Sequence, residues 1–358
     1  MRKIKFALIG CGRIAGKHCE AIHQLPEAEL AAVCDIRPER AKALGEKERV
    51  PYYSDYGEML AKEKGIDVVN VLTPSGLHAE QVIDVATRFK KHIVCEKPMA
   101  LTLASADKMI AACAESKVKL FIVKQNRYNL PVVKLREAVA AGRFGQLILG
   151  TVRVRWSRDQ KYYDQDSWRG TWFLDGGVLT NQASHHIDLL EWLLGQPLEV
   201  SAMAATRLVN IETEDVAVAT VRFANGGLGI IEATTAVRPK NLEGSISILG
   251  EKGSVEIGGL AVNEMKTWQF IDRQNEDAEV LSKYRENPPN IYGFGHVRYL
   301  ADVIDCVVND KTPPVDGREG RKSLELIVAL YESAETGKTV KVGTAADHCK
   351  LGKLNGKL

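Results

Sequence analysis

"KIKFALIGCGRIAGKH" (residues 3–18) opens the chain with a short apolar run that leads directly into closely spaced glycines. Gly10 permits a tight turn after a strand, Gly12 lets the backbone approach a pyrophosphate, and the small Ala15 lets the following helix pack on the strand. The helix N-terminus then faces the phosphates. A second apolar run ends at Asp35, roughly 20 residues further on, where a carboxylate binds ribose hydroxyls and disfavours a 2′-phosphate. The stretch therefore predicts a dinucleotide-binding turn that prefers NAD.

Around this turn, the first part of the chain alternates strand-like and helix-like segments. The strand candidates are short, mostly apolar runs, as expected of strands buried on both faces of a parallel sheet; they lie at residues 3–9, 29–35, 66–72, 92–96 and 119–124. Helical patterns separate them. This alternation predicts an α/β domain over residues 1–125 with a doubly wound parallel sheet of the Rossmann type.

The pattern changes from about residue 147. Longer alternating strands joined by glycine-rich turns, such as "ANGG" and "LGEKG", predict a large open, mainly antiparallel sheet with one covered face. Helices are expected near 181–194, 293–309 and 320–337, and the polar stretch 272–290 is expected to be a loop. Residues 126–358 are therefore predicted to form an α+β substrate-binding and oligomerisation domain, whose C-terminal helix can pack back on the first domain.

Composition narrows the class of protein. A formal net charge of +2 without a basic cluster argues against nucleic-acid binding. The seven cysteines are scattered and form no C-x-x-C pair, which argues against disulfides and structural zinc. No apolar run reaches the length of a membrane span. We therefore expect a cytoplasmic protein that binds neither nucleic acid nor membrane.

Two segments follow predicted strands at the edge where an open α/β sheet binds its ligands: "TPSGLHAE" (73–80) and "CEKPMA" (95–100). Lys97 lies in the second, next to Pro98, whose fixed φ stiffens the turn. A lysine at this edge can bind a substrate hydroxyl and stabilise the alkoxide that develops from it. Burial would lower its pKa and suit it to proton transfer.

Two adjacent histidines lie in "TNQASHHIDLLEWLLG" (180–195). At 100° per residue, His185 shares a polar helix face with Asn181, whereas His186 borders the apolar stripe. His185 is thus the favoured proton acceptor. Neighbouring positions on a helix diverge too far to ligate one ion readily, so no metal site is expected.

These motifs together resemble the glucose–fructose oxidoreductase/inositol dehydrogenase/MocA family over nearly the whole chain: G-x-G-x-x-A at 10–15, T-P-x-x-x-H at 73–78, E-K-P at 96–98 and H-x-x-D at 185–188. The resemblance implies an NAD(P)-dependent oxidation or reduction at a sugar or polyol carbon. It places Lys97 between nicotinamide and substrate and lets His185 exchange the hydroxyl proton. Many relatives carry an aspartate where Asn181 stands, and an amide can orient a group but cannot take a proton.

The glycine turn, the strand ends and the resemblance together give the predicted cofactor contacts. They are Gly10, Cys11, Gly12, Arg13, Ile14, Asp35, Thr73, Pro74, His78, Glu96, Lys97, Gln125, Trp168 and Arg169.

Basic and aromatic side chains alternate in "RVRWSRDQKYYDQDSWRGTWFLDGG" (153–177). Arginine binds carboxylate and phosphate in bidentate fashion, so the pattern favours an anionic sugar nucleotide over a neutral polyol. Arg153 and Arg155 share one strand face, and for these two a plain surface role is the alternative. The stretch is similar to bacterial enzymes that act on UDP-N-acetyl-glucosaminuronic acid.

That similarity implies oxidation of the sugar 3-hydroxyl to a ketone with NAD. An aminotransferase would follow, on the route to diacetamido uronic acids of O-antigen and other surface polysaccharide. Asn181 joins Lys97 and His185 as a catalytic candidate. The predicted substrate contacts are Lys97, Arg127, Arg158, Tyr162, Tyr163, Asn181, His185 and His186.

Several alternatives remain open at this point. An inositol or simple sugar dehydrogenase of the same family would act on free polyols. An NAD-sensing protein would need neither Lys97 nor His185. NADH could be released, or reoxidised in place by a 2-oxo acid. The open sheet face predicts an oligomer, and the resemblance implies a homo-tetramer or dimer.

Overall fold

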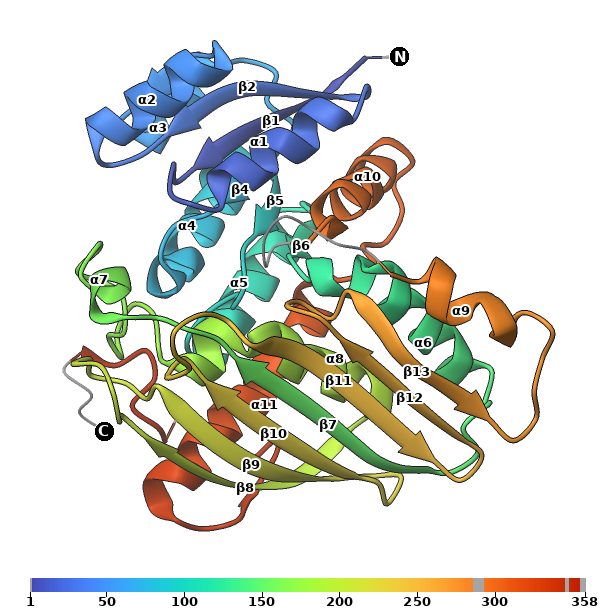
Figure 1. Cartoon of the computed structure of the whole chain (residues 1–358). Helices are drawn as coiled ribbons and strands as arrows, with labels where there is room; N and C mark the ends of the chain where they lie inside the picture. The colour runs from blue at the N-terminus through green and yellow to red at the C-terminus, as the bar shows by residue number, and fades with distance from the viewer. Residues whose placement is uncertain (1, 286–292, 345–347, 355–358) are drawn as a thin grey trace. The chain divides into compact units, whose positions relative to one another are not determined.

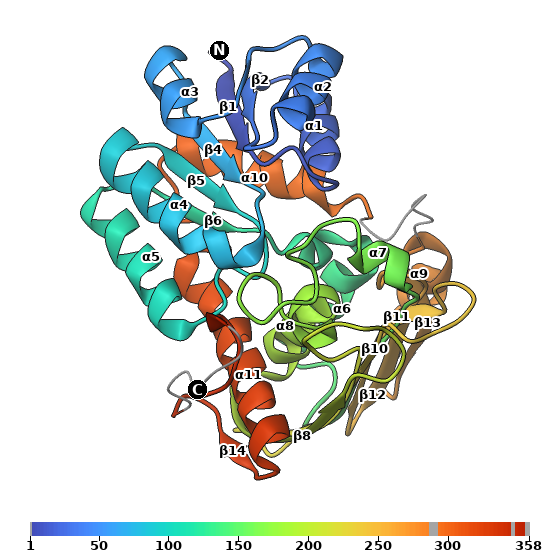
Figure 2. The same cartoon turned by 90° about the vertical axis from the view of Figure 1, so that its left-hand side faces the viewer.

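The chain forms two compact units (Figures 1 and 2). The computed structural model describes residues 2–285, 293–344 and 348–354. The first unit comprises Met1–Ala100, Ala104–Gln125 and His296–Arg321, and the second comprises Leu101–Leu103, Asn126–Gly295 and Lys322–Leu358. The chain thus leaves the first unit after Gln125 and returns to it for the helix that follows Gly295.

The first unit contains a parallel sheet with strand order β3-β2-β1-β4-β5-β6. This is the order of a doubly wound dinucleotide-binding fold, and it confirms the sequence-based prediction. Apolar side chains form its interior because strands covered on both faces have no solvent side; β4, for example, is buried along its whole length. The strands are β1 (Ile4–Ile9), β2 (Ala28–Cys34), β3 (Tyr52–Tyr53), β4 (Val68–Val71), β5 (His92–Cys95) and β6 (Leu120–Ile122).

The second unit contains an eight-stranded sheet of order β13-β12-β11-β7-β10-β9-β8-β14. Strands β7 and β10 pair in parallel, and the other pairs are antiparallel. The prediction of a mainly antiparallel sheet is confirmed. The strands are β7 (Leu147–Arg155), β8 (Pro197–Ala205), β9 (Val216–Phe223), β10 (Leu228–Thr234), β11 (Glu243–Gly250), β12 (Gly253–Gly258), β13 (Glu264–Phe270) and β14 (Val340–Lys341).

The helices are α1 (Ala15–Gln24), α2 (Pro38–Glu48), α3 (Tyr56–Lys62), α4 (His78–Asp84), α5 (Leu103–Glu115), α6 (Leu130–Ala140), α7 (Gln160–Tyr163), α8 (Ser184–Leu194), α9 (Asp277–Lys283), α10 (Gly295–Val308) and α11 (Gly317–Thr336). Within the described ranges, none of them combines the length and apolar composition needed to cross a bilayer.

Helices α8 and α11 lie on one face of the eight-stranded sheet (Figures 1 and 2). Strand β9 shows why: its residues alternate between buried and solvent-facing positions, so only one face needs a cover. The packing of α8 is close, because a Cβ atom at Gly150 of β7 would lie 2.6 Å from Cδ1 of Leu194. The apolar stripe predicted for this helix therefore does face the sheet.

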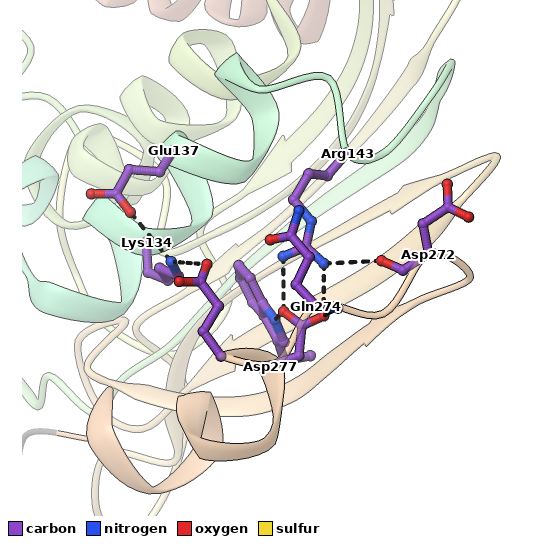
Figure 3. A network of polar contacts seen from close by, with 8 residues as sticks. Lys134, Glu137, Arg143, Asp272, Gln274 and Asp277 are labelled. Atoms are coloured by element: carbon purple, nitrogen blue, oxygen red, sulfur yellow. Dashed lines mark hydrogen bonds and ion pairs between the residues drawn. The ribbon is translucent and has the colours of Figure 1, made fainter.

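Two local predictions differ from the structure. The stretch 272–290 was expected to be a loop or excursion; residues 286–290 lie outside the described residues, and the described part contains α9. Asp277 at the start of α9 receives bidentate hydrogen bonds from Arg143, 2.8 and 2.7 Å long (Figure 3). The Trp268 indole also donates to Asp277 at 2.6 Å. These partners lie far away in sequence, which is why the local pattern read as a loop. The helix expected from residue 181 instead begins at Ser184, after a π-helical turn η4 (Val178–Gln182).

Candidate functional site

In the first unit, the glycine-rich turn joins β1 to α1. Gly10 has φ +102°, and a Cβ atom there would lie 2.8 Å from the carbonyl oxygen of Leu72. A Cβ at Gly12 would meet no atom within 4 Å, so this side of the turn is open to a ligand. The residue before α1, Ile14, supplies no side-chain hydrogen bond to the helix N-terminus. The turn therefore fits a pyrophosphate beside the first N–H groups of the helix.

Asp35 lies at the end of β2 and contacts the same turn. Its Oδ2 accepts from the backbone N–H of Cys11 at 2.8 Å, and its Oδ1 accepts from the N–H of Arg37 at 2.9 Å. Each carboxylate oxygen has a second lone pair that a ribose hydroxyl can use. The exposed Arg13 completes this group of predicted cofactor residues in the turn.

The segment after β4 is tied to the segment after β5 through His78. One ring nitrogen lies 2.8 Å from the carbonyl oxygen of Thr73, and the other lies 2.9 Å from that of Pro98. Burial lowers the pKa of His78, and the two carbonyl contacts oppose this shift. The imidazole thus braces both strand-end segments, with Pro74 partly exposed beside Thr73.

Glu96 and Lys97 follow β5. Glu96 is buried, and its Oε2 accepts from the backbone N–H of Lys97 at 3.0 Å, while Nε2 of His18 lies 3.0 Å from its Oε1. Burial acts to raise the pKa of Glu96, but His18 and His296 outweigh it and hold the pKa well below its usual range. A buried carboxylate therefore anchors the backbone of the half-buried Lys97. Gln125, the remaining predicted cofactor residue of this unit, is also buried.

His18, Glu96 and His296 also form a group that could hold a metal ion, with ligand atoms within 4.8 Å of one another. Nε2 of His296 lies 3.9 Å from Glu96 Oε1, too far for a hydrogen bond. The ring of His18 is already engaged at both nitrogens, since Nδ1 lies 2.9 Å from the Asn70 amide nitrogen. We therefore interpret the cluster as support for the Lys97 segment. That the protein needs no metal stays a prediction.

In the second unit, the turn η4 carries Asn181 and leads into α8. The Asn181 amide donates to Asp175, whose other oxygen accepts from the N–H of Gly170 at 2.8 Å. Oδ1 of Asn181 accepts from the Gln182 amide at 2.8 Å. Sequence reasoning missed Asp175, because nothing local marks it. The structure places a carboxylate directly beside the side-chain amide of Asn181.

His185 and His186 occupy the first turn of α8. His185 is 7% exposed and His186 is fully buried. The His186 ring packs edge-on against Trp156, with centroids 5.8 Å apart, and its Nε2 would lie 2.9 Å from a Cβ atom at Gly244 of β11. This burial favours the packing role for His186 over substrate contact.

Arg127 is held in a buried ion pair. Its Nε and Nη2 donate to the two carboxylate oxygens of Asp188 at 2.7 and 2.8 Å, and its guanidinium lies over the Trp192 ring. The H-x-x-D motif thus uses its aspartate to bind this arginine. A role for Arg127 in substrate binding stays a prediction.

Arg158 differs from the other predicted arginines in its partners. It donates to the carbonyl oxygen of Ser157 at 2.7 Å, to Asn241 Oδ1 at 3.2 Å and to Gln182 Oε1 at 3.0 Å. All three acceptors are neutral, and the described part of the chain supplies no carboxylate within ion-pair distance of it. Its positive charge is therefore available to an anion.

Tyr162 lies next to Arg158 and Arg169. Arg169 donates to the Tyr162 hydroxyl at 2.8 Å, and the Gln182 amide lies 3.2 Å from the same oxygen. The guanidinium of Arg169 stacks over Tyr162 and Trp168 and lies 3.5 Å from Asp166. Through Gln182, this cationic and aromatic cluster is hydrogen-bonded to Asn181.

Other side chains from the same stretch lie outside this cluster. Tyr163 is buried, and its hydroxyl is 3.2 Å from Thr235 Oγ1; burial raises its pKa to about 12. Arg155 makes bidentate hydrogen bonds to Glu232 at 2.6 and 2.8 Å on the outer face of the sheet, and Arg153 lies 3.7 Å from Glu243. The surface alternative stated for these two arginines agrees with these contacts.

Comparison with known proteins supplies independent information. A family model described as "Oxidoreductase family, NAD-binding Rossmann fold" matches residues 4–124, and one described as "Oxidoreductase family, C-terminal alpha/beta domain" matches residues 136–342. Among characterised relatives, the myo-inositol 2-dehydrogenase of Thermotoga maritima is 29% identical over 95% of this chain and 98% of its own.

Two solved structures are more similar. The WlbA dehydrogenase of Bordetella pertussis, in complex with NADH and UDP-GlcNAcA, is 44% identical with a TM-score of 0.91, over 95% of this chain and 98% of its own. The WlbA dehydrogenase of Chromobacterium violaceum, in complex with the same two molecules, is also 44% identical, with a TM-score of 0.89 over 96% and 97% of the two chains.

Proposed function

Because the chain belongs to the glucose–fructose oxidoreductase/inositol dehydrogenase/MocA oxidoreductase family, we propose that it oxidises the 3-hydroxyl of UDP-N-acetyl-glucosaminuronic acid. It is an NAD-dependent sugar dehydrogenase. NAD supplies the acceptor for the hydride that leaves the sugar carbon. Side chains of the protein bind the substrate and transfer the proton.

The observation that carries the substrate proposal is the uncompensated charge of Arg158. Its hydrogen-bond acceptors are neutral oxygens, whereas Arg127, Arg155 and Arg169 each have a carboxylate nearby. Among the described residues Arg158 has no carboxylate within ion-pair distance, so an anionic group of the ligand would pair favourably with this half-buried cation. A sugar with a carboxylate and a diphosphate does so, and a neutral polyol does not. The WlbA complexes with UDP-GlcNAcA support the same choice.

Proton handling is assigned to three residues. Lys97 binds the reacting hydroxyl and stabilises the alkoxide that develops on it, and His185 accepts its proton. Asn181, held by Asp175 and Gln182, orients the hydroxyl. Tyr162, Trp168 and Arg169 offer aromatic and cationic surface for the sugar nucleotide and the cofactor. The 3-keto product is a substrate suited to an aminotransferase, as in the synthesis of diacetamido uronic acids of surface polysaccharide.

A substrate panel tests this proposal. NADH absorbance would be followed with UDP-GlcNAcA, UDP-GlcNAc, UDP-glucuronate, myo-inositol and glucose, and we expect the highest kcat/KM with UDP-GlcNAcA. The second candidate is an inositol dehydrogenase, favoured by the Thermotoga maritima relative. Turnover of myo-inositol together with none of UDP-GlcNAcA would replace our substrate with that one. No turnover of any sugar, with intact NADH binding, would favour an NAD-sensing role.

A further inference from the structure

The turn that carries Asn181 and leads to His185 is attached to a buried carboxyl group that lies just before strand β9. The backbone N–H of Leu179 donates to Oε1 of Glu214 at 2.9 Å. The N–H of Val178 donates to the backbone carbonyl oxygen of Glu214 at 3.0 Å. One residue thus binds two successive amides of η4, and it is itself 3% exposed.

Tyr331 of α11 completes the attachment. Its hydroxyl donates to Glu214 Oε1 at 2.9 Å and accepts from the backbone N–H of Gly177 at 3.0 Å. It also accepts from the Thr180 hydroxyl at 2.8 Å. Tyr331 is 1% exposed. The two side chains therefore hold the turn from Gly177 to Thr180 by both backbone and side-chain bonds.

Gly177 shows how closely Glu214 approaches the turn. A Cβ atom at Gly177 would lie 2.1 Å from Oε2 of Glu214 and 2.4 Å from its backbone carbonyl oxygen. No real side chain fits in that space. A glycine is therefore required here by the carboxyl group and the backbone behind it, even though its own φ of −102° is open to any residue.

A buried carboxyl group is a costly way to hold a turn, because burial penalises its charged form. Apolar packing could fill the same space without that cost. Hydrogen bonds to the carboxyl group are directional, unlike apolar contacts. They therefore fix the orientation of the backbone from which Asn181 and His185 project. An error of about 1 Å in such an orientation can cost a hundredfold in rate.

We propose that Glu214 is a positioning residue of the dehydrogenase reaction, which acts with Tyr331 to fix the turn that presents Asn181 and His185 to the substrate. The inference rests on the roles assigned to those two residues under the proposed function. Glu214 itself touches no reacting atom in this scheme.

The test compares E214A, E214Q and Y331F with H185A in the full chain. The readouts are kcat, KM for UDP-GlcNAcA, NADH affinity by fluorescence titration and the unfolding midpoint. E214A should lower kcat by about a hundredfold. NADH affinity should stay within about twofold because Glu214 is bonded to Leu179, Val178 and Tyr331, none of which is a predicted cofactor contact. E214Q keeps an oxygen acceptor for Leu179 and should recover most of the rate. Y331F should fall between them.

R143A is the matched stability control. Arg143 binds Asp277 and the carbonyl oxygen of Asp272 within the same unit (Figure 3), and neither residue contacts η4. R143A should lower the unfolding midpoint and leave kcat unchanged. Suppose that R143A and E214A lower the unfolding midpoint equally and also lower kcat equally. Glu214 would then contribute only to stability, and the inference would be wrong.

The remaining outcomes distinguish the positioning role of Glu214 from the proposed function. Wild-type kcat in E214A, E214Q and Y331F, with turnover lost in H185A, would overturn the positioning role and leave the proposed function intact. Full turnover in H185A would overturn the assigned proton acceptor, and the inference with it. Should E214A fail to fold, Y331F decides: a lowered kcat supports the positioning role, and a wild-type kcat overturns it.

Discussion

Asn181 donates its side-chain amide to Asp175, so this catalytic candidate has a carboxylate as its direct neighbour. Replacing Asn181 by Asp would put two carboxylates in contact, and repulsion would force one of them to hold a proton. We expect N181D to lower kcat by roughly tenfold. This is the rate change expected if the repulsion between the two carboxylates costs the free energy of one pKa unit.

The double variant D175N/N181D exchanges the two groups and removes the repulsion. It should recover kcat to within about threefold of the wild type, because the amide–carboxylate pair is restored in the opposite sense. Initial rates with the preferred sugar nucleotide measure both variants. A double variant as slow as N181D would show that the order of the two groups, and not their repulsion, matters.

Arg158 should determine the affinity for the sugar nucleotide. R158A removes a guanidinium whose hydrogen-bond acceptors are all neutral among the described residues. We expect KM for UDP-GlcNAcA to rise by about ten- to a hundredfold, the loss of one charge-assisted contact. R153A is the matched control, because Arg153 lies on the outer sheet face near Glu232 and Glu243.

UDP-GlcNAc, which lacks the carboxylate, identifies the bound group. An unchanged KM for UDP-GlcNAc in R158A would assign Arg158 to the carboxylate, and an equal rise would assign it to the diphosphate. An R158A enzyme with wild-type KM for both sugars would contradict the charge argument altogether.

The sequence was sufficient for five of the six strands in the sheet of the first unit, because these strands are apolar runs. It did not reveal the two-residue β3 (Tyr52–Tyr53) or the return of residues 296–321 to this unit. Alternation along β7 was also sufficient to place Arg153 and Arg155 on one face of the sheet, while their role stays a prediction. Glu214 and Asp175 could not be found in this way. Their importance comes from hydrogen bonds to Leu179 and Asn181, and no local periodicity encodes such contacts.

The same limit explains where the helix boundary and α9 were predicted wrongly. The turn η4 depends on the bonds from Gly177 and Thr180 to Tyr331, which lies about 150 residues away along the chain. The pattern of apolar residues alone predicts that the helix continues through this turn. Arg158 was named from the sequence, but the fact that its partners are neutral required the structure.

Glu214 should make stability depend on pH. Burial, with the nearby charge of Asp175, raises its pKa from 4.5 to about 7, while the bonds from Leu179 and Tyr331 oppose the shift. Between these two pH values the folded chain holds a proton that the unfolded chain has released. The free energy of unfolding therefore falls as pH rises from about 4.5 to 7 and then levels off, by roughly 3 kcal/mol from this group.

E214Q lacks the titration, so its unfolding free energy should fall less than that of the wild type between pH 5 and pH 8. Denaturant unfolding at the two pH values measures the difference. Parallel pH profiles for the two proteins would mean that Glu214 titrates normally in the folded chain.

The outer face of the eight-stranded sheet should bind a second copy of the chain. Met203 of β8, Val218 of β9 and Ile230 of β10 are 75%, 48% and 40% exposed on this face, next to the arginine–glutamate pairs of β7, β10 and β11. Apolar area of this kind is usually buried in an oligomer. We expect a dimer or tetramer by sedimentation, and M203E/I230E should dissociate it. A wild-type chain that sediments as a monomer would contradict the expectation.

Chelators should leave the enzyme unaffected. The three residues that could hold a metal, His18, Glu96 and His296, include an imidazole engaged at both nitrogens, by Glu96 and by Asn70. A zinc ion would have to displace the hydrogen bond that holds Glu96, and with it the support of the Lys97 backbone. After dialysis against a chelator, we expect the wild-type unfolding midpoint and kcat to be unchanged, and metal analysis should find no stoichiometric ion.

H296A should then keep its kcat within about twofold, whereas H18A should lower kcat because Glu96 loses a hydrogen bond. A stoichiometric metal whose removal lowers both the midpoint and the rate would instead make this cluster a true metal site.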